Sequence, residues 1–320
     1  MAARDMPYTT DELIAMLHAH IAADGFARDP MWVDPHELFA GDTRESWLVE
    51  DVWPHGRQVH IHAARKTGKS LIALWVACNL AKGIDPFNGR EREPVRIAYL
   101  DYEMNMDDLR ERVMDMRFTE DDLQPTHWYY ALNPPLPMMD TQAGGEAVLE
   151  KLISANVQAV VFDTFSRIVQ GDENSNDTYR AFFRHTGARL KAAGIAMLRL
   201  DHEGHKEGVS RGASAKADDV DVVWQLRAAD NNAMQLVRKS ARMAWVPEYV
   251  NLERIEEPLA FRRIGVIIPN GTMDLVDQLD ALDVPLTATR TQLRKDYGIT
   301  ARNNVISAAM RVRTNRIIGL

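Results

Sequence analysis

Residues 67–70, with the sequence Thr-Gly-Lys-Ser, combine the residue types that bind phosphate. Successive backbone N–H groups at the start of a helix form a concave anion site, and the positive end of the helix dipole faces it. Lys69 can place its ammonium on the outer phosphates of a nucleotide, and Ser70 can place its hydroxyl on Mg²⁺. The chemistry that this stretch implies is the binding of a nucleotide together with Mg²⁺.

The segments on either side of this loop are the elements that must hold it. Polar and apolar side chains alternate in residues 57–62, which predicts a strand, and the apolar residues 71–77 predict a buried helix. The pattern G-x-x-x-x-G-K-[ST] is met except at its first position, where Ala63 replaces glycine and can make the turn if its φ is negative. We expect the nucleotide to contact Ala64, Arg65, Lys66, Thr67, Gly68, Lys69, Ser70 and Leu71.

An acidic residue, Asp163, ends a buried strand predicted at residues 157–162. In open α/β sheets ligands collect at the carboxyl ends of the strands, so this carboxylate should approach the phosphate loop. In nucleotide hydrolases such an acid belongs to the Mg²⁺ shell. We therefore expect Ser70 and Asp163 to bind the metal together.

A second acidic residue, Glu103, follows a strand predicted at residues 95–100. It can face the same crevice as Lys69 and there orient and deprotonate an attacking water. Alternatively it is only an acid at the N-terminus of the helix predicted at residues 106–116. The sequence alone leaves both interpretations open.

A third polar group ends the strand predicted at residues 195–200, where Asp201, His202 and His205 lie close together in the sequence. These residues are candidate metal ligands, although neither a cysteine nor a third histidine lies near. The other interpretations are a polar group that senses the γ-phosphate and a structural turn.

The composition excludes some classes of protein. The chain has 320 residues, of which 46% are hydrophobic and 26% are charged, as in ordinary globular proteins. A single cysteine, Cys78, rules out a disulfide within the chain. The start lacks an apolar signal segment, and no run reaches the length of about 18 apolar residues that spans a membrane. We expect a cytoplasmic protein with no membrane partner.

The rest of the chain predicts an α/β fold with a mostly parallel central sheet that antiparallel strands extend. Strands are predicted at 128–131, 220–226, 233–239 and 261–268, and helices at 9–24, 146–154 and 177–193. We expect three parts: an N-terminal helical and loop segment at 1–46, an ATPase core at 47–270, and a small helical module at 271–320.

The C-terminal module differs from the rest in charge. Residues 290–320 contain seven Lys or Arg and one acid, Asp296, although the whole chain has a net charge of −8. Helices predicted at 291–296 and 301–312, joined by a turn at Gly298, have the order helix, turn, helix. The module either binds nucleic acid, clamps a neighbouring subunit, or is only a solvated basic face.

Taken together, these stretches resemble the RecA-like P-loop ATPases, and within them the RepA-type hexameric replicative helicases and related AAA-family ATPases of phages and plasmids. The resemblance covers residues 47–265. It depends on the order and spacing of the phosphate loop, the Glu103 and Asp163 strand ends, Asp201-His202 with Lys206, the segment 210–214, and Trp47-Leu48-Val49 before the first strand.

The resemblance implies roles for individual residues. Glu103 is similar to the catalytic glutamate, Asp163 to the second acid near Mg²⁺, and His202 to the residue that couples the γ-phosphate to the DNA loops. Arg211 resembles an arginine finger supplied to the neighbouring subunit. The pair Lys239 and Arg242 resembles residues that also cross the interface, although its spacing is K-x-x-R rather than K-x-R, so which arginine is the finger stays open.

The resemblance also implies a function. The chain is expected to be an ATPase that acts as a helicase motor on single-stranded DNA and assembles as a homo-oligomeric, hexameric ring. Two other functions stay open: a recombinase or mediator ATPase that does not unwind DNA, and a regulatory protein that binds DNA and uses ATP as a switch. Two departures, Ala63 in the loop and Asp201-His202 in place of a His-His pair, also allow a slow ATPase.

Overall fold

A computed structural model describes residues 39, 46–173, 175–202, 219–229, 232–265 and 269–318, and no side chain after Thr314. Contacts divide the chain into Met1–Glu45 and Ser46–Leu320, and the second unit is described below. The helix predicted at residues 9–24 lies outside the described residues, as do His205, Lys206 and Arg211. The predicted boundaries at residues 46 and 270 stay predictions.

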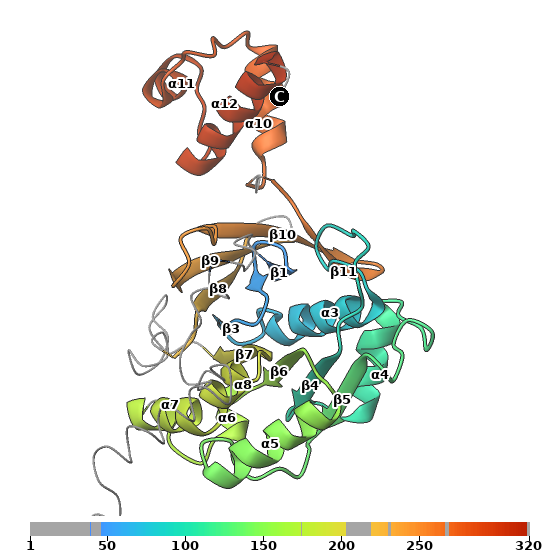
Figure 1. The fold of residues 1–320 in the computed structure, drawn as a ribbon. Helices are drawn as coiled ribbons and strands as arrows, with labels where there is room; N and C mark the ends of the chain where they lie inside the picture. The colour runs from blue at the N-terminus through green and yellow to red at the C-terminus, as the bar shows by residue number, and fades with distance from the viewer. Residues whose placement is uncertain are drawn as a thin grey trace, which may run out of the picture. The chain divides into compact units, whose positions relative to one another are not determined.

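A nine-stranded sheet forms the centre of the core, with the order β11-β10-β9-β8-β3-β7-β6-β4-β5 (Figure 1). The six strands from β8 to β5 run parallel, and β9, β10 and β11 continue the sheet in antiparallel pairs. This confirms the predicted α/β class, with a mostly parallel sheet that antiparallel strands extend. The strands are β3 (Gln58–Ala63), β4 (Ile97–Asp101), β5 (Trp128–Leu132), β6 (Ala159–Asp163), β7 (Ala196–His202), β8 (Val222–Ala228), β9 (Ala233–Ala241), β10 (Tyr249–Glu256) and β11 (Leu259–Arg263).

Helices cover both faces of this sheet (Figure 1). One apolar core contains residues of α3 (Lys69–Lys82) and α4 (Met106–Asp115). The other contains residues of α5 (Gln142–Ser154), α6 (Phe165–Ile168), α7 (Asn176–Phe182) and α8 (Ala188–Ala192). None of the described helices is long and apolar enough to cross a membrane.

Some elements differ from the prediction. Strand β10 was missed because its buried residues 250–252 are consecutive and the charged pair Glu253 and Arg254 follows them, so the sequence shows no period of two. Strand β11 ends at Arg263, before the predicted end. A two-stranded sheet of β1 (Trp47–Val49) and β2 (Trp53–Pro54) was also missed. Both strands are too short to show a period.

Helix α5 begins at Gln142, earlier than predicted, because the Thr141 side chain accepts the N–H of Gly144 and caps the helix. A methyl group on Gly145 would collide with the carbonyl oxygen of His185. Glycine therefore lets α5 approach a π-helical turn at Phe183–Gly187 closely. This turn interrupts the helix predicted at residues 177–193, which begins at Asn176.

Three helices and a small apolar core of their own form the C-terminal module (Figure 1). Two of them, α11 (Arg290–Asp296) and α12 (Asn303–Ile318), correspond to the predicted pair, and α12 extends further than predicted. The first, α10 (Thr272–Ala281), was not predicted, although Leu275, Val276 and Leu279 have helical spacing. This confirms that the C-terminal module is helical.

Candidate active site

The first position of the phosphate loop tolerates alanine because it belongs to a strand. Ala63 is the last residue of β3 and pairs with His202 of β7 and Leu226 of β8. A paired strand residue has an extended backbone with negative φ, which alanine adopts without strain. The missing glycine therefore does not distort the loop.

Gly68 makes the turn from the loop into α3, and its φ of 96° is a conformation that suits glycine. No side chain caps this helix and its first turn contains no acid. The N–H groups at the start of a helix have no partner within the helix, so those of Lys69, Ser70 and Leu71 suit an anion.

The preceding residues form a tight turn on the protein surface. Thr67 donates its hydroxyl to the carbonyl oxygen of Ala64 at 2.7 Å, and Lys66 has a φ of 63°. Ala64, Arg65 and Lys66 are exposed. Residues 64–71 thus form one continuous loop and helix start, an arrangement that suits the predicted nucleotide contacts.

Three residues from distant parts of the sequence meet beside this loop. Lys69 Nζ lies 3.1 Å from His202 Nδ1, and His202 Nε2 lies 3.8 Å from Glu103 Oε1. They come from α3, the end of β7 and the segment after β4. The strand order β3-β7-β6-β4 brings them to one edge of the sheet.

The surroundings keep Glu103 ionised. His202 is the main cause that lowers its pKa, desolvation acts in the opposite direction, and the charges of Arg167 and Lys69 lower it further. The cap of α4 is Asn105, which forms a capping box with Asp108. Glu103 therefore lies outside the cap and beside a histidine, which favours the interpretation as the water-activating base.

Residues that the sequence did not identify hold Glu103 in place. Asp101 Oδ1 accepts the backbone N–H groups of Glu103 at 2.7 Å and Met104 at 3.0 Å. The hydroxyl of Tyr130 donates to the other oxygen of Asp101. The only sequence signal was the spacing Asp-x-Glu at the strand end, which predicts such a turn.

Asp163 and Ser70 lie together, as predicted for a metal site. Asp163 is 2% exposed and accepts hydrogen bonds from Ser70 and from the Tyr99 hydroxyl, the latter at 2.6 Å. Burial raises the pKa of Asp163 to about 6 in spite of these bonds, and Asp101 and Glu103 raise it further. A buried carboxylate beside a hydroxyl is a donor set that suits Mg²⁺.

The raised pKa of Asp163 predicts a pH-dependent stability. The folded chain holds the proton of the Asp163 carboxyl more tightly than the unfolded chain, in which the pKa of this group is 3.8. The stabilisation is therefore complete below pH 3.8 and is lost as the pH rises through about 6. From about pH 5 to about pH 7 we expect the free energy of unfolding without Mg²⁺ to fall by about 1 kcal/mol through this group.

Urea unfolding at both pH values, compared with the variant Asp163→Asn, measures this effect. The variant should lack this part of the pH dependence, because its side chain does not titrate. A pH dependence that is the same in both proteins would contradict the assignment.

Asp201 makes structural contacts, and its predicted metal partner His205 lies outside the described residues. Its carboxylate accepts the Tyr179 hydroxyl at 3.0 Å and the N–H of His202 at 2.7 Å, and it lies 3.8 Å from His60. Within the described ranges, no three His, Cys, Asp or Glu side chains form a cluster that could hold a metal.

Of the finger candidates, Arg211 lies outside the described residues, and Arg242 is not brought to this site. The backbone N–H of Arg242 donates to the carbonyl oxygen of Asp221, and the guanidinium lies 3.7 Å from the Asp221 carboxylate. That carboxylate also accepts the N–H of Gln58, the first residue of β3. Arg242 therefore lies near the end of β3 that is opposite the phosphate loop, about 17 Å away along the strand. Lys239 on β9 is exposed.

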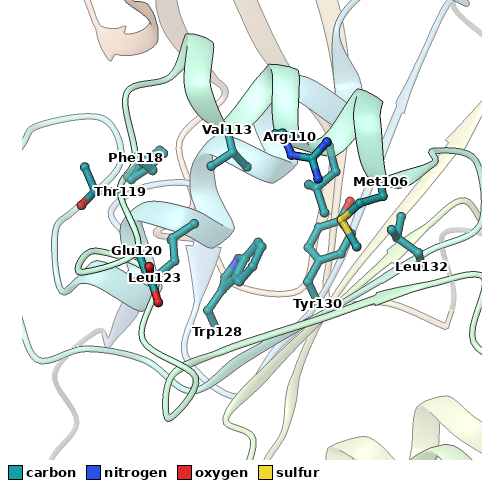
Figure 2. Close-up of a pocket in the computed structure, with 11 residues that line it drawn as sticks. Met106, Arg110, Val113, Phe118, Thr119, Glu120, Leu123, Trp128, Tyr130 and Leu132 are labelled. Atoms are coloured by element: carbon teal, nitrogen blue, oxygen red, sulfur yellow. The ribbon is translucent and has the colours of Figure 1, made fainter.

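A hollow of about 470 Å³ lies between α4 and the edge strand β5 (Figure 2). Apolar side chains line most of it, including Trp128, Val113 and Leu123, and Arg110 and Tyr130 also line it. Tyr130 is the residue that binds Asp101. Tyr130 therefore lines this hollow and also binds the aspartate that holds Glu103 in place.

The chain is similar to a known protein family. A family model described as an AAA domain matches residues 23–208, which include the phosphate loop, Glu103, Asp163 and His202. The match ends before Arg211, Lys239 and Arg242. No curated protein matches the chain.

Proposed function

Because this chain belongs to the AAA domain family, a family of P-loop ATPases, we propose that it is an ATP-driven motor on single-stranded DNA, a replicative helicase of the RepA type. The observation that carries the proposal is the contact series Lys69, His202, Glu103 at the phosphate loop. It supplies an ionised base, a histidine and a phosphate-binding cation within one site.

The residues of this site have separate tasks in hydrolysis. Glu103, held by Asp101, orients a water and takes its proton. The ammonium of Lys69 and the N–H groups of α3 stabilise charge on the phosphate oxygens. Ser70 and Asp163 would hold Mg²⁺, which neutralises phosphate charge when it is bound.

His202 supports the proposal that nucleotide and DNA are coupled. It contacts both Lys69 and Glu103, and it is the last residue of β7, directly before the segment 203–218. A nucleotide phosphate on Lys69 would compete with His202 for the ammonium. The histidine can therefore report the state of the nucleotide to the chain that follows it.

The position of Arg242 supports an assembly. A cation near the far end of β3 cannot reach the phosphate loop of its own chain, so a role of Arg242 in hydrolysis would have to be at a neighbouring subunit. We propose a homo-hexamer in which neighbouring subunits complete each site.

ATP turnover measured with and without single-stranded DNA, together with the mass of the assembly, tests the proposal. We expect an oligomer whose turnover rises when single-stranded DNA is added. Unwinding of a forked duplex is expected of a helicase, whereas strand annealing without unwinding would instead indicate a recombinase or mediator. A monomer whose turnover does not respond to DNA would contradict the proposal.

A further inference from the structure

The C-terminal module has its own fold. Helices α10, α11 and α12 surround an apolar core distinct from the two cores of the sheet. Arg313, which is 7% exposed, joins α12 to α10 through Asp280 and the carbonyl oxygen of Val284. The core consists of Leu275, Val276, Leu279, Val284, Leu293, Ile299, Val305, Ile306 and Ala309.

Local bonds fix the geometry of α11 and α12. Thr289 and Gln292 form a capping box at the start of α11. After α11 the chain turns at Gly298, which has a φ of 65°, and the N–H of Ile299 bonds to Leu293. Arg294 then donates to the carbonyl oxygen of Ala301 and the side chain of Asn303, each at 3.0 Å. The two helices are thus held as a helix-turn-helix unit.

Charge is segregated within the module. Residues 272–283, which contain α10, have four aspartates and no Lys or Arg. Residues 290–318, which contain α11 and α12, have seven Lys or Arg and one acid. One part of the module is therefore strongly basic, although the chain as a whole is acidic.

Helix α12 has an apolar face and a polar face. Val305, Ile306 and Ala309 are buried. Asn303, Ser307 and Arg311, four residues apart, are exposed, and exposed Arg302 precedes the helix. Residues four apart lie on one side of a helix, so these side chains form a row of hydrogen-bond donors without an acid.

An open hollow of about 570 Å³ lies beside this row, between α11 and the start of α12. The side chains that line it are Arg290, Thr291, Arg294, Lys295 and Asn303. All five can donate hydrogen bonds and three carry positive charge. This is the chemistry that binds phosphate oxygens.

We propose that this module binds duplex DNA, with α12 in the major groove and α11 on the phosphate backbone. The groove is about 12 Å wide, which admits one helix. Arginine can donate to guanine and a serine hydroxyl can bond to any base, so Arg302, Ser307 and Arg311 would face the base edges. Asn303, whose side chain accepts from Arg294, would instead help to position α12. Arg290 and Lys295 would bind phosphates.

The exposed residues favour duplex DNA over other partners. Proteins that bind single strands stack bases on aromatic side chains, and the described part of the module has one aromatic residue, Tyr297, packed against its core. A protein partner would need exposed apolar residues. Among the module's described side chains, the large exposed apolar ones are Met273 and Leu282, which lie on or next to α10 rather than on the basic helices.

Binding of the full-length chain to a labelled, random-sequence duplex over a range of salt concentrations tests the backbone contacts. The double variant Arg290→Ala, Lys295→Ala should lower the slope of log Kd against log salt by about two, because each lost phosphate contact removes about one unit. The matched control Arg90→Ala, Lys151→Ala loses the same charge from exposed positions outside the module and should leave the slope unchanged.

Selection of bound duplexes from a random pool tests the base contacts. The unaltered chain should enrich one sequence, and Arg302→Ala, Arg311→Ala should bind that duplex at least about tenfold more weakly while keeping the same helix content. Arg294 and Arg313 are left intact because they hold the module together.

The proposal is overturned if the chain does not bind duplex DNA, if no sequence is enriched, or if the control pair weakens binding as much as the module variants. Preference for a single strand or an RNA hairpin over the duplex would also overturn it. The inference does not depend on the motor function. The module variants should keep the ATP turnover of the unaltered chain with single-stranded DNA, and a chain without DNA-stimulated turnover can still bind the duplex.

Discussion

Replacing Glu103 by glutamine is expected to lower the turnover number for ATP by about 10² to 10⁴-fold, the range for loss of a general base. Glutamine keeps the size of the side chain but cannot accept the proton of the attacking water. Asp101 would still hold the backbone at this position, because its bond goes to the N–H group of residue 103. Phosphate release under saturating ATP measures the effect.

Nucleotide binding distinguishes loss of chemistry from loss of the site. The phosphate contacts come from the loop and α3, so Glu103→Gln should bind a fluorescent ATP analogue with nearly unchanged affinity. The control Glu111→Gln makes the same chemical change at an exposed position on α4 and should be fully active. Turnover of Glu103→Gln close to that of the control would exclude Glu103 as the base.

The parts of the site that are local in sequence could be predicted. Strand, loop and helix around Gly68 follow one another directly, and hydrophobic periodicity marks each of them. The same is true of Asp163, because a buried apolar run shows where a parallel strand ends. Each prediction required only a window of a few residues.

The contacts between these parts depend on the strand order. β7 lies between β3 and β6, so His202 reaches Lys69 on one side and Glu103 on the other. The sequence leaves that order open, since every β-α-β unit could insert its strand elsewhere in the sheet. The resemblance to RecA-like ATPases, rather than periodicity, suggested that Glu103 and His202 share one site.

Buried polar anchors were the hardest features to predict. Asp221 has no exposed side-chain surface, yet it binds Gln58, Lys191 and Arg242, which lie in different elements. Gln58 is 163 residues away in the sequence. No local pattern marks such a residue, because its stability depends on partners that only the folded chain assembles.

Arg211→Ala is expected to lower DNA-stimulated ATP turnover by about 10³ to 10⁵-fold, the contribution of an arginine finger, while ATP binding and assembly persist. Lys239→Ala and Arg242→Ala are the comparison variants. Arg242→Ala should lower the melting temperature only slightly, because Lys191 still lies 2.8 Å from the buried Asp221 carboxylate. A loss of turnover with Arg242→Ala alone, without loss of stability, would assign the finger to Arg242.

Mixing two inactive variants shows whether the finger acts on a neighbour. Arg211→Ala subunits keep Lys69 and Glu103, and Glu103→Gln subunits keep the finger. In a mixed ring, a site of the first kind can receive the arginine of the second, so turnover should return when the two proteins are combined. A finger that acts on its own chain cannot be restored in this way, because every chain would then lack either the base or the arginine. Absence of recovery in rings shown to be mixed would therefore contradict both the trans finger and the shared active site.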